Sequence, residues 1–243
     1  VYVRGSDNAS DTTPADNTLN LNAGRNITLA GAQLNNSSIG TTTITAGEHL
    51  QIATVTTGQD EKAVKDPNNY SHIAHQEEVG TQISTTGALS LTAAQDLTLR
   101  AVTVTSEGHI QAQAGNHVRI EAGQADSLND QARKTTSKGF LSSTTTTTRD
   151  RYDDSTSVAT TLSGNSITVS AANDITIQGS GVVADNDVQL NAGRDLNILA
   201  STHTHTEEHD EHKSKSGVFG SGGVGITLGK STQSTDQQTT HTS

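Results

Sequence analysis

The stretch Leu21-Asn-Ala-Gly-Arg-Asn-Ile-Thr-Leu29 sets a pattern that the rest of the chain repeats. Apolar residues occupy alternate positions, as in a strand with one buried face, and the alternation resumes after a polar turn at Gly24-Arg-Asn26. An α-helix, with its period of about 3.6 residues, cannot keep alternate positions on one face. The stretch therefore predicts two short β-strands joined by a tight turn.

Five further segments share this pattern and make it an internal repeat. They are Ile44–Ile52, Leu91–Leu99, Ala112–Ile120, Val169–Ile177 and Leu190–Ile198. A short spacing between successive segments alternates with one at least twice as long. The chain is therefore expected to contain three pairs of coils, at about 18–56, 83–123 and 162–200, followed by insertions at about 57–82, 124–161 and 201–243. Residues 1–17 are expected to be the tail of an earlier insertion, and the absence of an initial Met suggests a piece of a longer protein.

A coil of about 21 residues can bury its inward face only by stacking on a neighbouring coil. The composition agrees with such a narrow core, because only 30% of the 243 residues are apolar, 2% are aromatic, and Cys, Met and Trp are absent. We therefore predict an all-β chain forming a single right-handed parallel β-helix, with the insertions extruded as β-hairpins or loops. Some coils carry a third apolar position, at Leu34, Val104 and Val182.

One polar turn position recurs in all six coils. It is occupied by Asn26, His49, Asp96, His117, Asp174 and Asp195. Since Asn and Asp adopt the left-handed backbone conformation more readily than most residues, we expect a left-handed turn at this position.

The charge of the chain limits the class of partner. Its net charge of −11 predicts that neither nucleic acid nor an anionic membrane is held by charge. Without Cys there is no disulfide or thiolate metal site, and we predict no cofactor.

Paired coils, the string Leu-x-Ala-Gly-x-Asp-Leu-x-Leu and the Ser/Thr-rich insertions together resemble the haemagglutinin repeats of filamentous haemagglutinin and of contact-dependent growth inhibition effectors. Two insertions share a similar element, Lys134-Thr-Thr-Ser-Lys-Gly-Phe140 and Lys213-Ser-Lys-Ser-Gly-Val-Phe219. The resemblance covers nearly the whole chain.

This resemblance implies a structural and interaction segment of a large secreted filament on the bacterial cell surface, exported by an outer-membrane two-partner secretion transporter. The segment would engage the target-cell outer membrane or a surface receptor and aid toxin delivery. The shaft of a filamentous haemagglutinin adhesin is the alternative.

The candidate interaction residues all lie in the insertions. They are Phe140, Leu141, Phe219, Tyr70 and Tyr152. An exposed aromatic residue beside a weakly polar β-stretch would suit contact with a membrane or partner. The alternative is that each Phe folds back and holds its own hairpin against the coils.

The sequence gives weak support to a metal site and to a carbohydrate-acting enzyme, and neither is predicted. On a strand, His203 and His205 would share a face near carboxylates, which suits zinc or nickel, but a solvated hairpin stem explains the segment equally and no metal site is predicted. A carbohydrate-acting β-helix enzyme would need two or three acids converging in a cleft. Since Asp96 and Asp174 fall at turns, we predict no catalytic residues and no enzyme.

Overall fold

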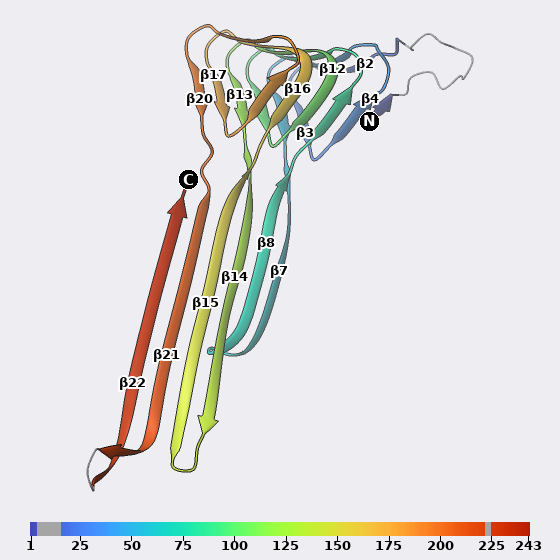
Figure 1. The fold of residues 1–243 in the computed structure, drawn as a ribbon. Helices are drawn as coiled ribbons and strands as arrows, with labels where there is room; N and C mark the ends of the chain where they lie inside the picture. The colour runs from blue at the N-terminus through green and yellow to red at the C-terminus, as the bar shows by residue number, and fades with distance from the viewer. Residues whose placement is uncertain (4–15, 222–224) are drawn as a thin grey trace. The chain divides into compact units, whose positions relative to one another are not determined.

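The computed structural model describes residues 1–3, 16–221 and 225–243 (Figure 1). Within these residues the chain is all-β, with no helix; accordingly, none of the described residues forms a helix that could span a membrane. Two compact units are distinguished. The parallel unit comprises Val1–Thr57, Glu78–Gln124 and Ser157–Thr202, and the antiparallel unit comprises Gly58–Glu77, Ala125–Thr156 and His203–Ser243.

The parallel unit consists of three ladders of parallel strands. The first ladder contains β2 (Leu19–Ala23), β5 (Thr42–Ala46), β10 (Leu89–Ala93), the second halves of β12 (Thr103–Ala114) and β16 (Thr161–Ala171), and β19 (Val188–Ala192). The second contains β3 (Ile27–Ala30), β6 (Leu50–Ala53), β11 (Leu97–Arg100), β13 (Val118–Glu121), β17 (Ile175–Gln178) and β20 (Leu196–Leu199). The third contains β1 (Tyr2–Val3), β4 (Gln33–Asn36), β9 (Gln82–Thr85), the first halves of β12 and β16, and β18 (Gly181–Ala184).

Equivalent positions of the six repeats are aligned by this pairing. In the first ladder Leu91 pairs with Ile44 on one side and with Ala112 on the other. All three side chains are fully buried. Burial stabilises Leu and Ile side chains such as Leu91 and Ile44 by about 1.5–3 kcal/mol each relative to exposure. The predicted alternation within each repeat is thus the inward face of two adjacent strands.

The third ladder carries the third apolar position expected from the sequence and adds two core residues that the repeat pattern did not reveal. Leu34 and Val104 are buried there, and so are Ile83 and Leu162. The latter two directly follow the first two insertions, pairing with Leu34 and Val104 respectively. Since an insertion separates them from their own repeat, they have no fixed spacing in the sequence.

The first residues of the chain also belong to this ladder. Tyr2 pairs with Asn35 and Val3 with Asn36, both in parallel. The expectation that residues 1–17 are the tail of an insertion is therefore wrong for Tyr2 and Val3; residues 4–15 lie outside the description.

All three insertions leave the parallel unit at one equivalent corner, between the second ladder and the third. In the alternate turns without an insertion, this corner is closed by a residue with positive φ, namely Gly31 (56°), Ala101 (49°) or Gly179 (55°). Glycine adopts this conformation without steric cost. Insertion therefore replaces a tight corner and leaves the strands on either side in register.

At the corner where the chain returns from an insertion, a buried threonine side chain hydrogen-bonds the backbone of the neighbouring turns. We call this contact the threonine seal. Thr160 Oγ1 accepts a hydrogen bond from Val102 N (3.0 Å) and donates one to the Glu121 carbonyl oxygen (2.7 Å). Thr81 does the same between Ala32 N and the Ala53 carbonyl oxygen, both at 3.2 Å. Each hydroxyl thus accepts from the amide that follows the tight corner of one turn, and donates to a carbonyl at the end of a second-ladder strand in the neighbouring turn.

Replacing Thr160 by Val should destabilise the parallel unit by about 1–3 kcal/mol, because the buried Val102 amide loses its acceptor without a change in side-chain volume. Denaturant unfolding measures the loss. Thr168→Val, on the less buried outward face of β16, which begins directly after Thr160, should change the free energy of unfolding by less than about 0.5 kcal/mol. Equal effects of the two substitutions would contradict the sealing role.

The residues at the recurring polar turn position stack on one another, but the turn does not have the left-handed backbone predicted from the sequence. Among the described non-glycine residues only Ala101 has a positive φ, so the expected left-handed turn is wrong. Instead, the side chain of one turn accepts a hydrogen bond from the next turn's amide, as from His49 N to Asn26 Oδ1 (3.1 Å). Carboxylates also meet imidazoles there, with His117 Nδ1 at 3.2 Å from Asp174 Oδ2. The position links turns rather than bending the chain.

The antiparallel unit is a single sheet made by the three insertions. Its strands are β7 (Val55–Asp66), β8 (Asn69–Val79), β14 (Gly123–Lys138), β15 (Ser142–Val158), β21 (Thr204–Ser221) and β22 (Gly225–Thr242), side by side in chain order (Figure 1). Of the side chains described in this unit, only that of Ala132 is a buried apolar one. These described side chains therefore form no hydrophobic core, and the strands are held by hydrogen bonds and cross-strand side-chain contacts.

Candidate interaction surface

A polar network joins the first two hairpins of the antiparallel unit. Tyr70 on β8 donates its hydroxyl proton to Asp130 Oδ1 on β14 at 2.9 Å. Arg149 on β15 donates from Nη2 to Asp130 Oδ2 (2.9 Å) and from Nε to both Asp130 Oδ1 and the Tyr70 hydroxyl (3.1 Å each). Hydrogen bonding from Arg149 lowers the pKa of Asp130, and burial raises the pKa of Tyr70. The Asp130 carboxylate thus links side chains on β8, β14 and β15.

Removing this carboxylate by Asp130→Ala should loosen the pairing of β8, β14 and β15 by about 1–2 kcal/mol. This value allows for the partial exposure of Arg149, which screens the charge. Amide hydrogen exchange in β8 and β14 reports such local opening. Asp153→Ala, which removes an exposed partner of Arg151 on the same strand, should change exchange little. Unchanged protection in Asp130→Ala would show that the backbone ladder alone holds the hairpins.

Histidine–aspartate pairs join the second hairpin to the third. Strands β15 and β21 place Asp150 opposite His209 and Asp154 opposite His205. His209 Nδ1 lies 2.5 Å from Asp150 Oδ1, and His205 Nδ1 is hydrogen-bonded to Asp154 Oδ1. In both cases the hydrogen bond to aspartate is the main cause that raises the histidine pKa above its ordinary value of 6.5.

This geometry predicts a pH dependence. A histidine whose pKa is raised on folding contributes stability that is fully present below its unfolded pKa and is lost as pH rises through the folded pKa. Protection of β15 and β21 from hydrogen exchange, corrected for intrinsic rates, should therefore fall as pH rises from about 6 to about 9. His205→Asn with His209→Asn should flatten this dependence, whereas His75→Asn should preserve it. A dependence that survives the double substitution would rule out these pairs as its source.

The histidine segment does not assemble a metal centre in the part of the chain that the structure describes. No group of three or more His, Asp or Glu side chains there could hold a metal ion. His203 precedes β21 and exchanges backbone hydrogen bonds with Ser243. The carboxylates opposite His205 and His209 act as hydrogen-bond partners of single imidazoles.

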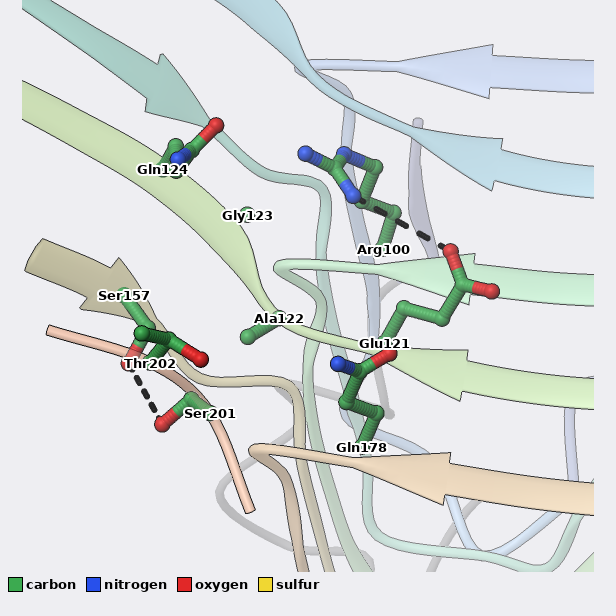
Figure 2. A pocket seen from close by; sticks show the side chains of 9 residues that line it. All are labelled: Arg100, Glu121, Ala122, Gly123, Gln124, Ser157, Gln178, Ser201 and Thr202. Atoms are coloured by element: carbon green, nitrogen blue, oxygen red, sulfur yellow. Dashed lines mark hydrogen bonds and ion pairs between the residues drawn. The ribbon is translucent and has the colours of Figure 1, made fainter. Parts of the chain in front are cut away.

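A polar hollow of about 220 Å³ lies in the parallel unit, near the corner where insertions leave (Figure 2). Its lining residues are Arg100, Glu121, Ala122, Gly123, Gln124, Ser157, Gln178, Ser201 and Thr202. Glu121 is the one acid among them and lies 3.9 Å from Arg100, which is itself paired with Glu78 at 2.8 Å. Hydrolysis of a glycosidic bond generally takes two carboxylates flanking it. This hollow therefore lacks the acid pair that such chemistry uses.

Carboxylates also gather on the antiparallel unit, where Asp210 pairs directly with Asp236. A shallow depression there is lined by these two acids, Glu208 and Arg149, together with Gln237 and Gln238. Like charges placed directly opposite on two strands are destabilising. The nearby guanidinium offsets part of this repulsion.

The five candidate interaction residues have different surroundings. Phe140 is 99% exposed and Leu141 62% exposed, both at the turn between β14 and β15. Tyr152 is 38% exposed and lies opposite Glu207, whose charge raises its pKa. Tyr70 is tied into the network with Asp130 and Arg149. Phe219 pairs with Thr227 through the backbone, and its side chain lies outside the description.

The structure adds an apolar residue that the sequence reasoning did not single out. Leu228 on β22 is 83% exposed and pairs with Val218 on β21. Val218 N in turn donates a hydrogen bond to the Leu141 carbonyl oxygen at 3.1 Å. Leu141, at the turn that precedes β15, therefore lies beside Val218 and Leu228 on β21 and β22, and it follows Phe140 in the chain. We call these four residues the apolar tip; only the register between hairpins reveals it.

Comparison with known proteins gives matches over most of the chain. The family described as "Hemagglutinin repeat" matches residues 63–152 and 141–243. The "tRNA nuclease CdiA" of Escherichia coli (strain STEC_O31) is 38% identical over 57% of this chain. The "16S rRNA endonuclease CdiA" of Enterobacter cloacae is 34% identical over 65%, and the "Deoxyribonuclease CdiA" of Dickeya dadantii 36% identical over 62%.

The matched region is a small part of each of these relatives. It covers 4%, 5% and 4% of their lengths, respectively. Their names refer to three different nuclease activities, although they share this region. No solved structure matches the chain.

Proposed function

Because the chain belongs to the Hemagglutinin repeat family, we propose that it is a structural and interaction segment of a large secreted bacterial surface filament. In this proposal the parallel unit is a right-handed β-helix that acts as a spacer, and the antiparallel unit makes the contacts. Right-handedness follows from the general rule that about 98% of crossover connections between parallel strands are right-handed. The similarity to proteins named CdiA favours a contact-dependent growth inhibition effector over an adhesin shaft.

The observation that carries the proposal is the exposure of the apolar tip. Phe140 and Leu228 are 99% and 83% exposed, although apolar side chains are scarce in this chain. The described side chains of the antiparallel unit form no hydrophobic core to which the tip could contribute. Apolar groups clustered on the surface of a soluble protein commonly mark a contact site. Here that contact is with the target-cell outer membrane or a receptor on it.

No catalytic role is proposed for this segment. The three relatives carry names of different nucleases, yet all three share the region. A region shared by proteins of different activity suits a common step such as delivery. Export of the parent protein through an outer-membrane transporter of two-partner secretion, and its place on the cell surface, are likewise inferred from the family.

Substituting Phe140 and Leu141 by Ser tests the proposal. Both side chains are largely exposed, so the circular dichroism spectrum and the melting temperature should stay unchanged while association with cells of a Gram-negative target strain falls at least about tenfold. The matched control carries Ile39→Ser and Val64→Ser, which are 50% and 58% exposed elsewhere in the chain. Association that is equal in the two variants would refute the role of the tip.

A further inference from the structure

The last coil of the parallel unit presents apolar side chains on its open side. In the described chain β19 pairs with β16 and β20 pairs with β17, and β20 ends its ladder (Figure 1). On these two strands the inward residues Val188, Leu196 and Ile198 are 45%, 46% and 66% exposed. A solenoid end that stays in water usually has a polar outer face. The last coil is therefore suited to contact with another coil.

The first coil of the parallel unit has a matching open side. Strands β2 and β3 lie at the other ends of the first and second ladders. Strand pairing along the ladders makes position 21 of the first coil equivalent to position 190 of the last, and position 29 equivalent to position 198. A second copy placed one step farther along would set its Leu21 against Leu190 and its Leu29 against Ile198. These contacts repeat the aliphatic stacking of the inner coils.

The third ladder gives the two ends complementary outlines. At the beginning of the chain it extends one strand beyond the first coil, because β1 pairs with β4. At the other end its last described strand is β18, which precedes β19 and β20 in the chain. A second copy would place β1 beside β18, with Tyr2 opposite Val183 and Val3 opposite Ala184. Tyr2 and Val183 are 58% and 59% exposed, and such aromatic and β-branched pairs stabilise sheets.

Gly24, in the turn of the first coil, leaves room for a preceding coil. In three later coils a glycine holds the equivalent position, and the other two coils have alanine there. A Cβ atom on Gly47, Gly115 or Gly193 would lie 2.2, 2.1 or 2.0 Å from a carbonyl oxygen of the preceding coil. A Cβ atom on Gly24 would meet no atom within 4 Å. Glycine at position 24 thus permits the close approach of turns that the later glycines make within the chain.

Backbone groups at the two ends are complementary as well. At each joint between coils the amide of this turn position donates to the preceding coil, as from Gly47 N to the Ala23 carbonyl oxygen (2.9 Å). In the docked pair, Gly24 N of the second copy would donate to the Ala192 carbonyl oxygen in the same way. The ladder of backbone hydrogen bonds would therefore continue from one copy into the next.

One pair of like charges opposes this docking. Arg25 of the second copy would stack on Arg194. Each guanidinium has a carboxylate partner in its own copy, since Arg25 pairs with Glu48 at 3.3 Å and Arg194 pairs with Asp174. The repulsion is thus partly offset, and salt screens what is left of it. Added salt should therefore not weaken the contact.

We propose that the parallel unit binds a second copy of this chain end to end, with the last coil of one copy against the first coil of the next. The two surfaces in contact are different, so each added copy leaves one docking face open at either end. Contacts of this kind that do not close into a ring give an open linear series. This docking uses neither the apolar tip nor any other part of the antiparallel unit.

Sedimentation velocity of the full chain over a range of concentrations tests this docking. We expect monomers to give way to dimers and longer linear species as the concentration rises. The variant I198D places a charge in the contact, and G24Q places a side chain where the turn of another copy would lie. Each variant alone should associate at least about 100-fold more weakly. The circular dichroism spectrum should stay unchanged, because Ile198 is 66% exposed and a Cβ atom on Gly24 meets no atom.

A mixture of the two variants distinguishes end-to-end docking from other association. I198D keeps an intact first coil and G24Q an intact last coil, so an equimolar mixture should form a dimer that grows no further. The matched control I73D introduces the same charge at a residue that is 47% exposed on β8, and it should associate like the original chain. A chain that stays monomeric at all concentrations, single variants that associate as the original does, or a mixture that stays monomeric would overturn the inference.

Discussion

Parallel hydrogen bonding between successive turns of the chain is the constraint on which the rest of this structure depends. It places Ile44, Leu91 and Ala112 side by side, so that an inward position in one turn is covered by the inward positions of its neighbours. A chain with 2% aromatic residues can fold in this way because each small aliphatic side chain is buried by its equivalents. Burial of an inward position thus requires a neighbouring turn on each side. Leu196 and Ile198 on β20 have a neighbouring turn on one side only, and they are 46% and 66% exposed.

Much of the parallel unit could be predicted from the sequence because its signal is local and repeated. The alternation from Leu21 to Leu29 gives two strands, and five similar segments give the stacking. Residues that return from an insertion could not be found in this way. Ile83 and Leu162 are as buried as the repeat residues, but the number of residues that separates each from its repeat is set by a hairpin and not by the coil.

The antiparallel unit was less accessible to sequence reasoning. Polar, Thr-rich strands without a buried face carry no pattern that fixes their partners. The pairing of Tyr70 with Asp130 and Arg149 joins residues from three different strands. The apolar tip likewise depends on register, because Leu141 and Leu228 are far apart in sequence and meet only through β21. Phe140 and Leu141 could be singled out from the sequence, whereas Val218 and Leu228 could not.

The threonine seal at the insertion corner has a consequence for how such chains can change over evolution. Thr81 and Thr160 satisfy the backbone at the corner whatever the length of the hairpin beyond it. The hairpin strands indeed differ, at 12 and 11 residues for β7 and β8, 16 and 17 for β14 and β15, and 18 each for β21 and β22. Lengthening or shortening a hairpin therefore leaves the aliphatic core untouched. The contact-making strands can diversify under selection while the stacked coils that carry them stay the same.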